Sequence, residues 1–393
     1  MAKVVAATGN EAVADALRQV NPDVSSAYPI TPATDIMQRF TSFVSNGKVK
    51  TEMILVESEH SAMSGCIGAS AAGGRVMTAT SSQGLALMWE ELFIASGTRL
   101  PIVMALVNRA LSAPLNIHGD HSDGMGARDC GWIQLWSENG QEAYDNTIQA
   151  FRIAEHMDIR LPAMVCLDGF IISHSIERIE YLDDAAVKNF VREFRQLYPL
   201  LDMEHPVSYG PLILPDYYME FRRAQAEVMT KVPKVVLDVA KDFEKISGRK
   251  YGLFETYRLD DAEVALVILN SAAGTSKDVI DSFREKGIKA GLLKPRLYRP
   301  FPYEEVGNAL KNLKAVCVLD RADAFGGSYG PMFADIAASL YPYRERPLLI
   351  NKIYGLGGRD YMPSHAELVL NELVEIAKTG KAKTLKEYIG VRE

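Results

Sequence analysis

The sequence has few cysteines, and none of them lie close together along the chain. The four that occur among its 393 residues form no CxxC pair: Cys66, Cys130, Cys166 and Cys317. Zinc and iron–sulfur sites need several thiolates side by side, usually contributed as such short pairs. The pattern excludes a metal or cluster site built from this chain's own cysteines, and we expect four reduced, buried thiols.

The sequence also lacks a long apolar run and an excess of positive charge. No apolar run approaches the roughly 18 residues that a membrane helix needs, and the opening MAKVVAATGNEA lacks the layout of a secretion signal. The formal net charge of −7 argues against a nucleic-acid binder or a ligand of anionic membranes. We therefore expect a soluble, cytoplasmic protein with neither nucleic acid nor membrane as a partner.

What the sequence does contain is a regular alternation of apolar runs. A chain of 393 residues with 48% hydrophobic residues is long enough for two domains. In the first part, short apolar runs predict strands at 24–30, 52–57, 75–82 and 101–110. Longer runs between them predict helices at 32–45, 59–74 and 84–97. This alternation indicates parallel βαβ units, and the nearly continuous apolar strands indicate a sheet covered on both faces.

The second part of the chain repeats this alternation after an interruption. A buried strand is predicted at 161–170, and a charged, proline-punctuated stretch with a long amphipathic segment at 215–246 follows it. The alternation then restarts at 262–270. We predict an α/β fold with a doubly wound parallel-sheet domain over 1–235 including a helical extension, a linker over 236–258, and a smaller α/β domain over 259–393.

Polar residues cluster where four predicted strands end. The ends read YPITP, ESEH, TSSQG and NR, and they begin at positions 28, 57, 80 and 108. In an open parallel sheet, ligands bind beyond the carboxyl ends of the strands. One such end is ordinary helix capping, but four together predict a binding site at this edge.

Two prolines frame a threonine at the first of these ends. Pro32 suits the first turn of a helix and biases Thr31 to an extended conformation. Thr31 would then cap the helix and offer a hydroxyl at its positive end, a suitable place for a substrate carboxylate. The alternative is a turn delimited by Pro29 and Pro32 with a capping threonine and no ligand.

Two charged residues at this edge are candidates for chemistry. Arg109 follows an apolar strand, and its planar guanidinium matches a carboxylate with two hydrogen bonds; the alternative is an internal salt bridge to Glu57 or Asp120. Glu59 opens a helix of small residues, where a carboxylate held against an apolar surface could share a proton with a ring nitrogen. Its alternative role is a first-turn glutamate favoured by the helix dipole.

Two further motifs carry weaker signals. The loop NIHGDHSDGMGARD at 116–129 contains His118, Asp120, His121 and Asp123. Without helical ligand spacing it favours a substrate-side or interface loop over a metal site. The segment YGLGGRD at 354–360 lacks the full GxGxxG pattern of a dinucleotide loop, and we reject that interpretation.

Taken together, the motifs YPITPAT, VESEHSA, TSSQGLALM and VNRALSAPLNIHGDHSD resemble the α subunits of multi-subunit 2-oxoacid:ferredoxin oxidoreductases, pyruvate:ferredoxin oxidoreductase (pyruvate synthase) in particular. LYRPFP at 297–302 and YGLGGRD are similar to the second domain of that family, so the resemblance covers nearly the whole chain.

The resemblance implies a site for thiamine diphosphate shared between two domains. This chain would supply the pyrimidine-side domain, followed by a transketolase C-terminal-like domain. Glu59 would be the catalytic glutamate that bonds the pyrimidine N1′, and Thr31 and Arg109 would hold the substrate carboxylate. The other candidates for cofactor contacts at the same strand ends are Tyr28, Pro29, Ile30, Ser82 and Gln83.

The sequence lacks the motifs for the rest of such an enzyme. The diphosphate half of the family carries Gly-Asp-Gly, and this sequence contains none. Mg²⁺ and [4Fe–4S] clusters are therefore expected on partner subunits, with no metal on this chain. The implied partners are β, γ and ferredoxin-like δ subunits, together with ferredoxin, pyruvate and coenzyme A.

The implied reaction is the reversible oxidative decarboxylation of pyruvate with coenzyme A to acetyl-CoA and CO₂. The nearest alternative keeps the chemistry but changes the substrate to oxalate, 2-oxoglutarate or a branched-chain 2-oxoacid. An alternative of another class is a non-redox thiamine-dependent transferase or decarboxylase subunit. A third is a catalytically silent assembly subunit, against which the joint presence of Glu59, Thr31 and Arg109 argues.

Overall fold

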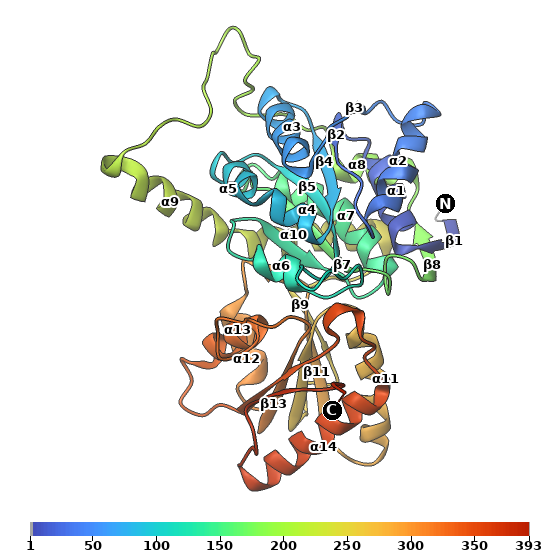
Figure 1. The fold of residues 1–393 in the computed structure, drawn as a ribbon, viewed down its shortest axis with the longest axis vertical. Coiled ribbons are helices and arrows are strands. Elements are labelled where there is room, and N and C mark those ends of the chain that lie inside the picture. Colours follow the sequence, from blue (N-terminus) through green and yellow to red (C-terminus); the bar gives the residue numbers. More distant parts are fainter. Residues whose placement is uncertain (1–2, 393) are drawn as a thin grey trace.

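Two parallel sheets, one in each half of the chain, form the framework of the computed structural model, which describes residues 3–392 (Figure 1). The first sheet has seven strands in the order β12-β6-β7-β5-β4-β2-β3, and all neighbours are parallel except β12 with β6. Its strands are β2 (Val24–Ser26), β3 (Glu52–Ile54), β4 (Val76–Thr80), β5 (Ile102–Asn108), β6 (Ile133–Trp136), β7 (Ala163–Asp168) and β12 (Leu297–Arg299).

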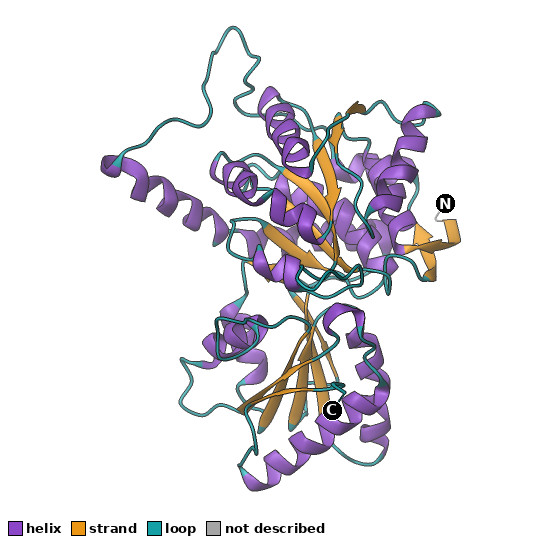
Figure 2. Ribbon diagram, viewed as in Figure 1, coloured by secondary structure: helices purple, strands orange, loops and turns teal. Residues whose placement is uncertain are grey.

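Helices cover both faces of this sheet (Figure 2). The central strands β4, β5, β6 and β7 are buried at every position, as expected for a sheet covered on both sides. We call this sheet and the elements packed on it the N-terminal unit. Its helices are α1 (Gly9–Val20), α2 (Thr34–Ser45), α3 (Glu59–Ala72), α4 (Ser82–Leu87), α5 (Trp89–Gly97), α6 (Ser122–Gly126), α7 (Gly140–Ala154) and α8 (Asp184–Val191).

Local sequence signals explain where several of these helices begin. Thr8 and Glu11 form a capping box at the start of α1, because each side chain bonds the other residue's backbone N–H. Ser58 caps α3 and Asn139 caps α7 with a single side-chain bond each. At the edge of the unit, β1 (Lys3–Thr8) pairs antiparallel with β8 (Ile176–Tyr181) as a separate two-stranded sheet.

The second sheet has six strands in the order β15-β14-β13-β10-β11-β9, and only β9 runs antiparallel to its neighbour. It forms the C-terminal unit with its helices (Figure 1). The strands are β9 (Phe254–Tyr257), β10 (Val264–Ile268), β11 (Ala290–Pro295), β13 (Ala315–Asp320), β14 (Leu348–Ile353) and β15 (Lys386–Tyr388). The helices are α11 (Ala272–Glu285), α12 (Tyr303–Leu310), α13 (Pro331–Leu340), the short 3₁₀ helix η1 (Leu356–Gly358) and α14 (Pro363–Thr379).

The segment between the units is helical and partly packed. It contains α9 (Pro215–Met229) and α10 (Val232–Ser247). Figure 1 shows α9 and the loop before it extending away from the N-terminal unit, and in α9 only Val228 is buried. By contrast, α10 buries six residues, and its apolar face belongs to the same core as α1 and α7.

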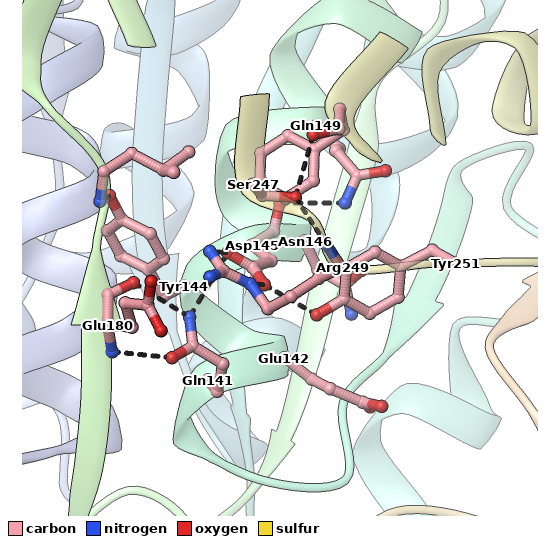
Figure 3. Close-up of polar contacts among 12 residues, drawn as sticks. Gln141, Glu142, Tyr144, Asp145, Asn146, Gln149, Glu180, Ser247, Arg249 and Tyr251 are labelled. Atoms are coloured by element: carbon pink, nitrogen blue, oxygen red, sulfur yellow. Dashed lines mark hydrogen bonds and ion pairs between the residues drawn. The ribbon is translucent and has the colours of Figure 1, made fainter. Parts of the chain in front are cut away.

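A buried carboxylate on α7 fastens the end of α10 to the N-terminal unit (Figure 3). Asp145 is fully buried and accepts two hydrogen bonds from the guanidinium of Arg249, at 2.6 and 2.8 Å, and one from the Tyr251 hydroxyl at 2.6 Å. Residues 236–258, predicted as a linker, thus contain most of α10 and all of β9. The division of the chain into domains at these bounds stays a prediction.

The α/β class with two parallel sheets is confirmed, and the differences lie at the ends of predicted elements and in elements that were not predicted. The first predicted strand is short and stops at Ser26, and the predicted helix 84–97 is two helices, α4 and α5. The helix α1 was not predicted. All four cysteines are buried and free, and burial raises the pKa of Cys66 to about 12. Within residues 3–392, no helix is both long and apolar enough to cross a membrane.

Candidate functional site

The candidate site lies where the carboxyl ends of β2, β3, β4 and β5 meet. These strands are neighbours in the first sheet, so their following loops share one edge. The loops deliver the segments 27–33, 55–59, 81–84 and 109–110, which include every predicted site residue.

Glu59 is a buried carboxylate without a partner. It is the first residue of α3, and the residue is 7% exposed. No other residue in the described part of the chain gives its carboxylate a hydrogen bond or a cation. The oxygens of Glu59 are not among the fully buried side-chain atoms that lack a partner, so they remain open to a ligand that would complete their bonding.

Gly84 makes room for this carboxylate, a role that the sequence analysis did not assign. A Cβ atom at position 84 would lie 2.8 Å from Glu59 Oε1 and 2.4 Å from Thr80 Oγ1. Only glycine therefore lets the start of α4 approach Glu59 so closely. The available signal was the glycine four residues after Thr80 in TSSQG, at the end of a buried strand.

The predicted capping role of Thr31 is wrong. Helix α2 begins at Thr34, and its N-cap is Ala33 with helical backbone angles and no side-chain cap bond. The Thr31–Pro32 peptide is cis, and the N–H of Ala33 bonds the carbonyl of Ile30 at 2.8 Å. This turn contains Pro32 and precedes the helix. Thr31 is therefore an exposed turn residue and does not cap α2.

Arg109 and Thr31 are nevertheless brought together. The guanidinium donates from Nη1 to the Thr31 carbonyl at 3.0 Å and from Nε to the Asn116 carbonyl at 2.9 Å. The predicted alternative, a salt bridge to Glu57 or Asp120, is wrong, since Arg109 forms no ion pair among residues 3–392. It is 7% exposed and uses two of the five N–H donors that a guanidinium carries. The remaining donors suit a carboxylate ligand.

Asp123 organises the backbone around Arg109. Its carboxylate accepts from the N–H of Ser82 at 2.9 Å, the N–H of Arg109 at 2.9 Å, the N–H of Gly124 at 2.7 Å and the side-chain amide of Asn108 at 2.9 Å. Burial raises the pKa of Asp123 to about 7, although all four hydrogen bonds oppose the rise. Sequence reasoning placed this residue only within a loop favoured as a substrate-side or interface loop over a metal site, and assigned it no role of its own.

The remaining predicted cofactor contacts reach the same edge with different exposures. Ser82 is buried, and its hydroxyl donates to the Ala110 carbonyl, while the Gln83 amide donates to Ser112 Oγ at 2.7 Å. Tyr28 is 39% exposed, Pro29 is exposed and Ile30 is half-buried. The geometry brings all five to the site, and their contacts with a cofactor stay a prediction.

The loop containing His118 and His121 connects the site to the C-terminal unit. His121 is buried, and its Nε2 lies 2.8 Å from Asp168 Oδ1 at the end of β7. Asp168 also pairs with Arg321 at 3.0 Å and accepts from Ser271. Burial opposes ionisation of Asp168, yet Arg321 and His121 hold its pKa below the usual range. The loop thus contacts the C-terminal unit, and its role as a substrate-side or interface loop stays a prediction.

The residues fit a bound aromatic base better than a metal. Within residues 3–392, the site edge holds one unpartnered carboxylate, Glu59, where an ion would need several ligand atoms. An unpartnered carboxylate can accept a hydrogen bond from a protonated ring nitrogen. The β3 and β5 ends lie three strand spacings of about 4.8 Å each apart, so Glu59 and Arg109 would contact different parts of a ligand.

Comparisons with known proteins identify the family. Residues 15–241 match the family described as pyruvate flavodoxin/ferredoxin oxidoreductase, thiamine diphosphate-binding, and residues 262–366 match pyruvate:ferredoxin oxidoreductase core domain II. The chain belongs to the pyruvate flavodoxin/ferredoxin oxidoreductase family. The recognition made from the motifs is therefore confirmed, and the N-terminal unit is of the thiamine diphosphate-binding type.

Members of this oxidoreductase family resemble the chain over nearly its full length. Pyruvate synthase subunit PorA of Thermotoga maritima is 54% identical, with 99% of this chain and 98% of that protein covered. PorA of Pyrococcus furiosus is 44% identical, with 98% and 96% covered. Ketoisovalerate oxidoreductase subunit VorA of Pyrococcus abyssi is 41% identical, with 95% and 94% covered.

Solved structures with a similar fold support the architecture of this chain. The 2-oxoglutarate:ferredoxin oxidoreductase of Magnetococcus marinus superimposes with a TM-score of 0.74 at 20% identity, covering 95% of this chain but only 65% of that chain. A split-gene transketolase superimposes with a TM-score of 0.52 at 13% identity. The chain is thus a subunit of an oxidoreductase of the 2-oxoacid:ferredoxin class, with a transketolase-like fold.

Proposed function

We propose that this chain is the α-type subunit of a pyruvate:ferredoxin oxidoreductase and forms the pyrimidine half of a shared thiamine diphosphate site. The single observation that carries the proposal is the buried carboxylate of Glu59 without a partner at the sheet edge. Bound thiamine diphosphate supplies the carbon nucleophile that attacks the 2-oxo carbon of the substrate. The tasks of this chain are to hold a proton, to orient the acid and to exclude water.

Glu59 has the surroundings of a proton-sharing group. We assign to it the hydrogen bond with the pyrimidine N1′, in which a carboxyl oxygen holds or returns the proton of that ring nitrogen. Gly84 keeps the carboxylate in a fixed position, because the α4 backbone lies directly against it. Burial of Glu59 away from bulk water would favour this exchange over proton loss to solvent.

Arg109 and Thr31 have the surroundings of a carboxylate-binding pair. The free N–H donors of Arg109 and the exposed hydroxyl of Thr31 could bind the two oxygens of one small acid. The carboxylate would leave as CO₂ in the forward direction, so these contacts contribute chiefly to binding and alignment. Arg109 is preorganised for this task, since two carbonyls already fix its guanidinium.

The remaining parts of the enzyme would reside on other subunits. Gly-Asp-Gly is absent and the four cysteines are scattered, which supports a β subunit that carries the diphosphate end, Mg²⁺ and a [4Fe–4S] cluster. We propose γ and ferredoxin-like δ subunits as well, with coenzyme A as acyl acceptor and ferredoxin as electron acceptor. The arm at 197–221 is suited to subunit contact, and its exposed apolar residues are Leu197, Tyr198, Leu200, Leu201, Met203, Leu212, Leu214, Tyr217, Tyr218, Met219 and Phe221.

Isolation of the native complex tests the proposal. We expect copurifying cysteine-rich chains, bound iron and thiamine diphosphate, and reduction of a viologen dye that depends on both pyruvate and coenzyme A. A complex without iron that decarboxylates or transfers carbon units without reducing the dye would indicate a non-redox thiamine enzyme instead.

A second candidate keeps the reaction and changes the acid. The relative named ketoisovalerate oxidoreductase is 41% identical over 95% of the chain, so a branched-chain 2-oxoacid is the alternative substrate. A panel of pyruvate, 2-oxoisovalerate, 2-oxoglutarate and oxalate separates the candidates. We expect the highest kcat/KM for pyruvate, and a higher value for 2-oxoisovalerate would favour the alternative.

A further inference from the structure

The glycine-rich segment YGLGGRD of the C-terminal unit reaches the neighbourhood of Arg109. It follows β14 and contains η1, and Gly355, Gly357 and Gly358 all have positive φ angles of 63°, 61° and 83°. These left-handed conformations favour glycine and turn the peptide groups of the loop toward the N-terminal unit.

The peptide of Gly357 is held from both sides by the loop that follows β5. Its N–H donates to Asp120 Oδ2 at 3.0 Å, and its carbonyl accepts from the side-chain amide of Asn116 at 2.8 Å. Gly358 fits closely as well, because a Cβ there would lie 2.3 Å from His118 Cβ. Nearby, Arg321 donates from Nε to the Gly355 carbonyl at 3.2 Å and pairs with Asp168, which closes the junction.

Asn116 connects the Gly357 contacts to the guanidinium of Arg109. Its side-chain amide bonds Gly357, while its own backbone carbonyl accepts from Arg109 Nε at 2.9 Å. Asp120 stabilises the same loop, since its second oxygen accepts from Ser122 at 3.0 Å through the backbone N–H. A single residue thus touches both the C-terminal unit and the side chain assigned to the substrate carboxylate.

We propose that loop 355–358 of the C-terminal unit is a positioning element for Arg109 that acts through Asn116 without touching the substrate. The inference rests on the proposed function, because it takes Arg109 as the group that binds the 2-oxo acid. The proposal gives the C-terminal unit a part in substrate affinity. The affected contact is the one between Arg109 and the carboxylate that all 2-oxo acids share.

The test uses the whole purified complex and a glycine pair of matched backbone strain. Gly357→Ala places a Cβ 2.4 Å from Asn116 Nδ2, whereas Gly380→Ala, at the end of α14 with a φ of 70°, places its Cβ with nothing within 4 Å. Asn116→Ala is the third variant, and it keeps the backbone carbonyl that bonds Arg109. It also serves if Gly357→Ala fails to fold.

We expect Gly357→Ala and Asn116→Ala each to raise KM for the 2-oxo acid about tenfold, the size of one weakened hydrogen bond to a charged group. The Kd for thiamine diphosphate and the KM for coenzyme A should change less than about twofold. Because both variants break one contact, the double variant should be no worse than the more impaired single variant. Gly380→Ala should match the wild type.

Three results would overturn the inference alone while the wild type turns over a 2-oxo acid: an unchanged KM in Gly357→Ala and Asn116→Ala, an equal rise in Gly380→Ala, or fully additive effects in the double variant. A wild-type complex that turns over no 2-oxo acid would overturn the proposed function, and this inference with it.

Discussion

Replacement of Glu59 by glutamine separates catalysis from stability. The substitution preserves the size of the side chain and removes only its charge and its ability to exchange a proton. In the folded chain the carboxylate bonds no other described residue, so no internal hydrogen bond or ion pair is lost. We therefore expect the complex to assemble and to bind thiamine diphosphate.

The expected magnitudes differ widely. A positioned proton partner contributes about 10²- to 10⁴-fold to rate, which corresponds to about 3 to 5 kcal/mol in the activation free energy. The free energy of unfolding should change by less than about 1 kcal/mol, as for substitutions that break no contact. A structural carboxylate would show the opposite result, with a loss of stability and nearly normal turnover.

Pyruvate-dependent viologen reduction by the purified complex gives the rate, and urea unfolding of the chain gives the stability. Glu57→Gln is the matched control, since it makes the same chemical change two residues away on an exposed side chain. Turnover of Glu59→Gln within threefold of the wild type would refute the assignment of Glu59.

Two further predictions concern the site, and a third concerns the contact of Asp145 with the end of α10. Arg109→Ala should raise the KM for pyruvate and lower kcat/KM about 10²-fold, because charge-assisted bonds to the acid are lost; an unchanged KM would contradict this. Titration of Asp123 should make kcat/KM rise with pH through about 7. The reason is that only the ionised carboxylate can accept hydrogen bonds from all four N–H donors that it holds in place. A kcat/KM profile that is flat from pH 6 to 8 would contradict this prediction. Asp145→Ala should lower the free energy of unfolding by about 3 to 5 kcal/mol by leaving the Arg249 charge without its partner. Asp238→Ala, which breaks only exposed pairs with Lys234 and Lys241, should cost under about 1 kcal/mol in the same urea experiment.

Periodicity in the sequence predicted the architecture because burial on both faces leaves a strong apolar signal. The strands β4, β5 and β7 lie inside the predicted ranges, since each is fully buried. The short strand β12 was missed because its partner β6 lies about 160 positions earlier in the sequence. Pairing over such a distance depends on tertiary packing, which local propensity does not contain.

The site could be predicted as a set of residues but only partly as a geometry. Polar residues at adjacent strand ends placed Glu59 and Arg109 at one edge, as topology requires. The conformation of Thr31 could not be derived from the sequence. Proline suits the first turn of a helix, but this preference does not reveal the separate turn that precedes α2. The role of Asp123 as a hydrogen-bond acceptor was not predicted, because it depends on which N–H groups the fold brings to this loop carboxylate.

The strand β12 links the two halves of the chain, and this limits where the chain can be cut into separate fragments. Its residues follow β11 of the second sheet, yet they complete the outer edge of the first sheet beside β6. A fragment that stops before Leu297 would leave β6 without its outer neighbour, and an uncovered strand edge invites association with other chains. The two halves are therefore best produced as one polypeptide, with any tag or fusion placed outside this crossing.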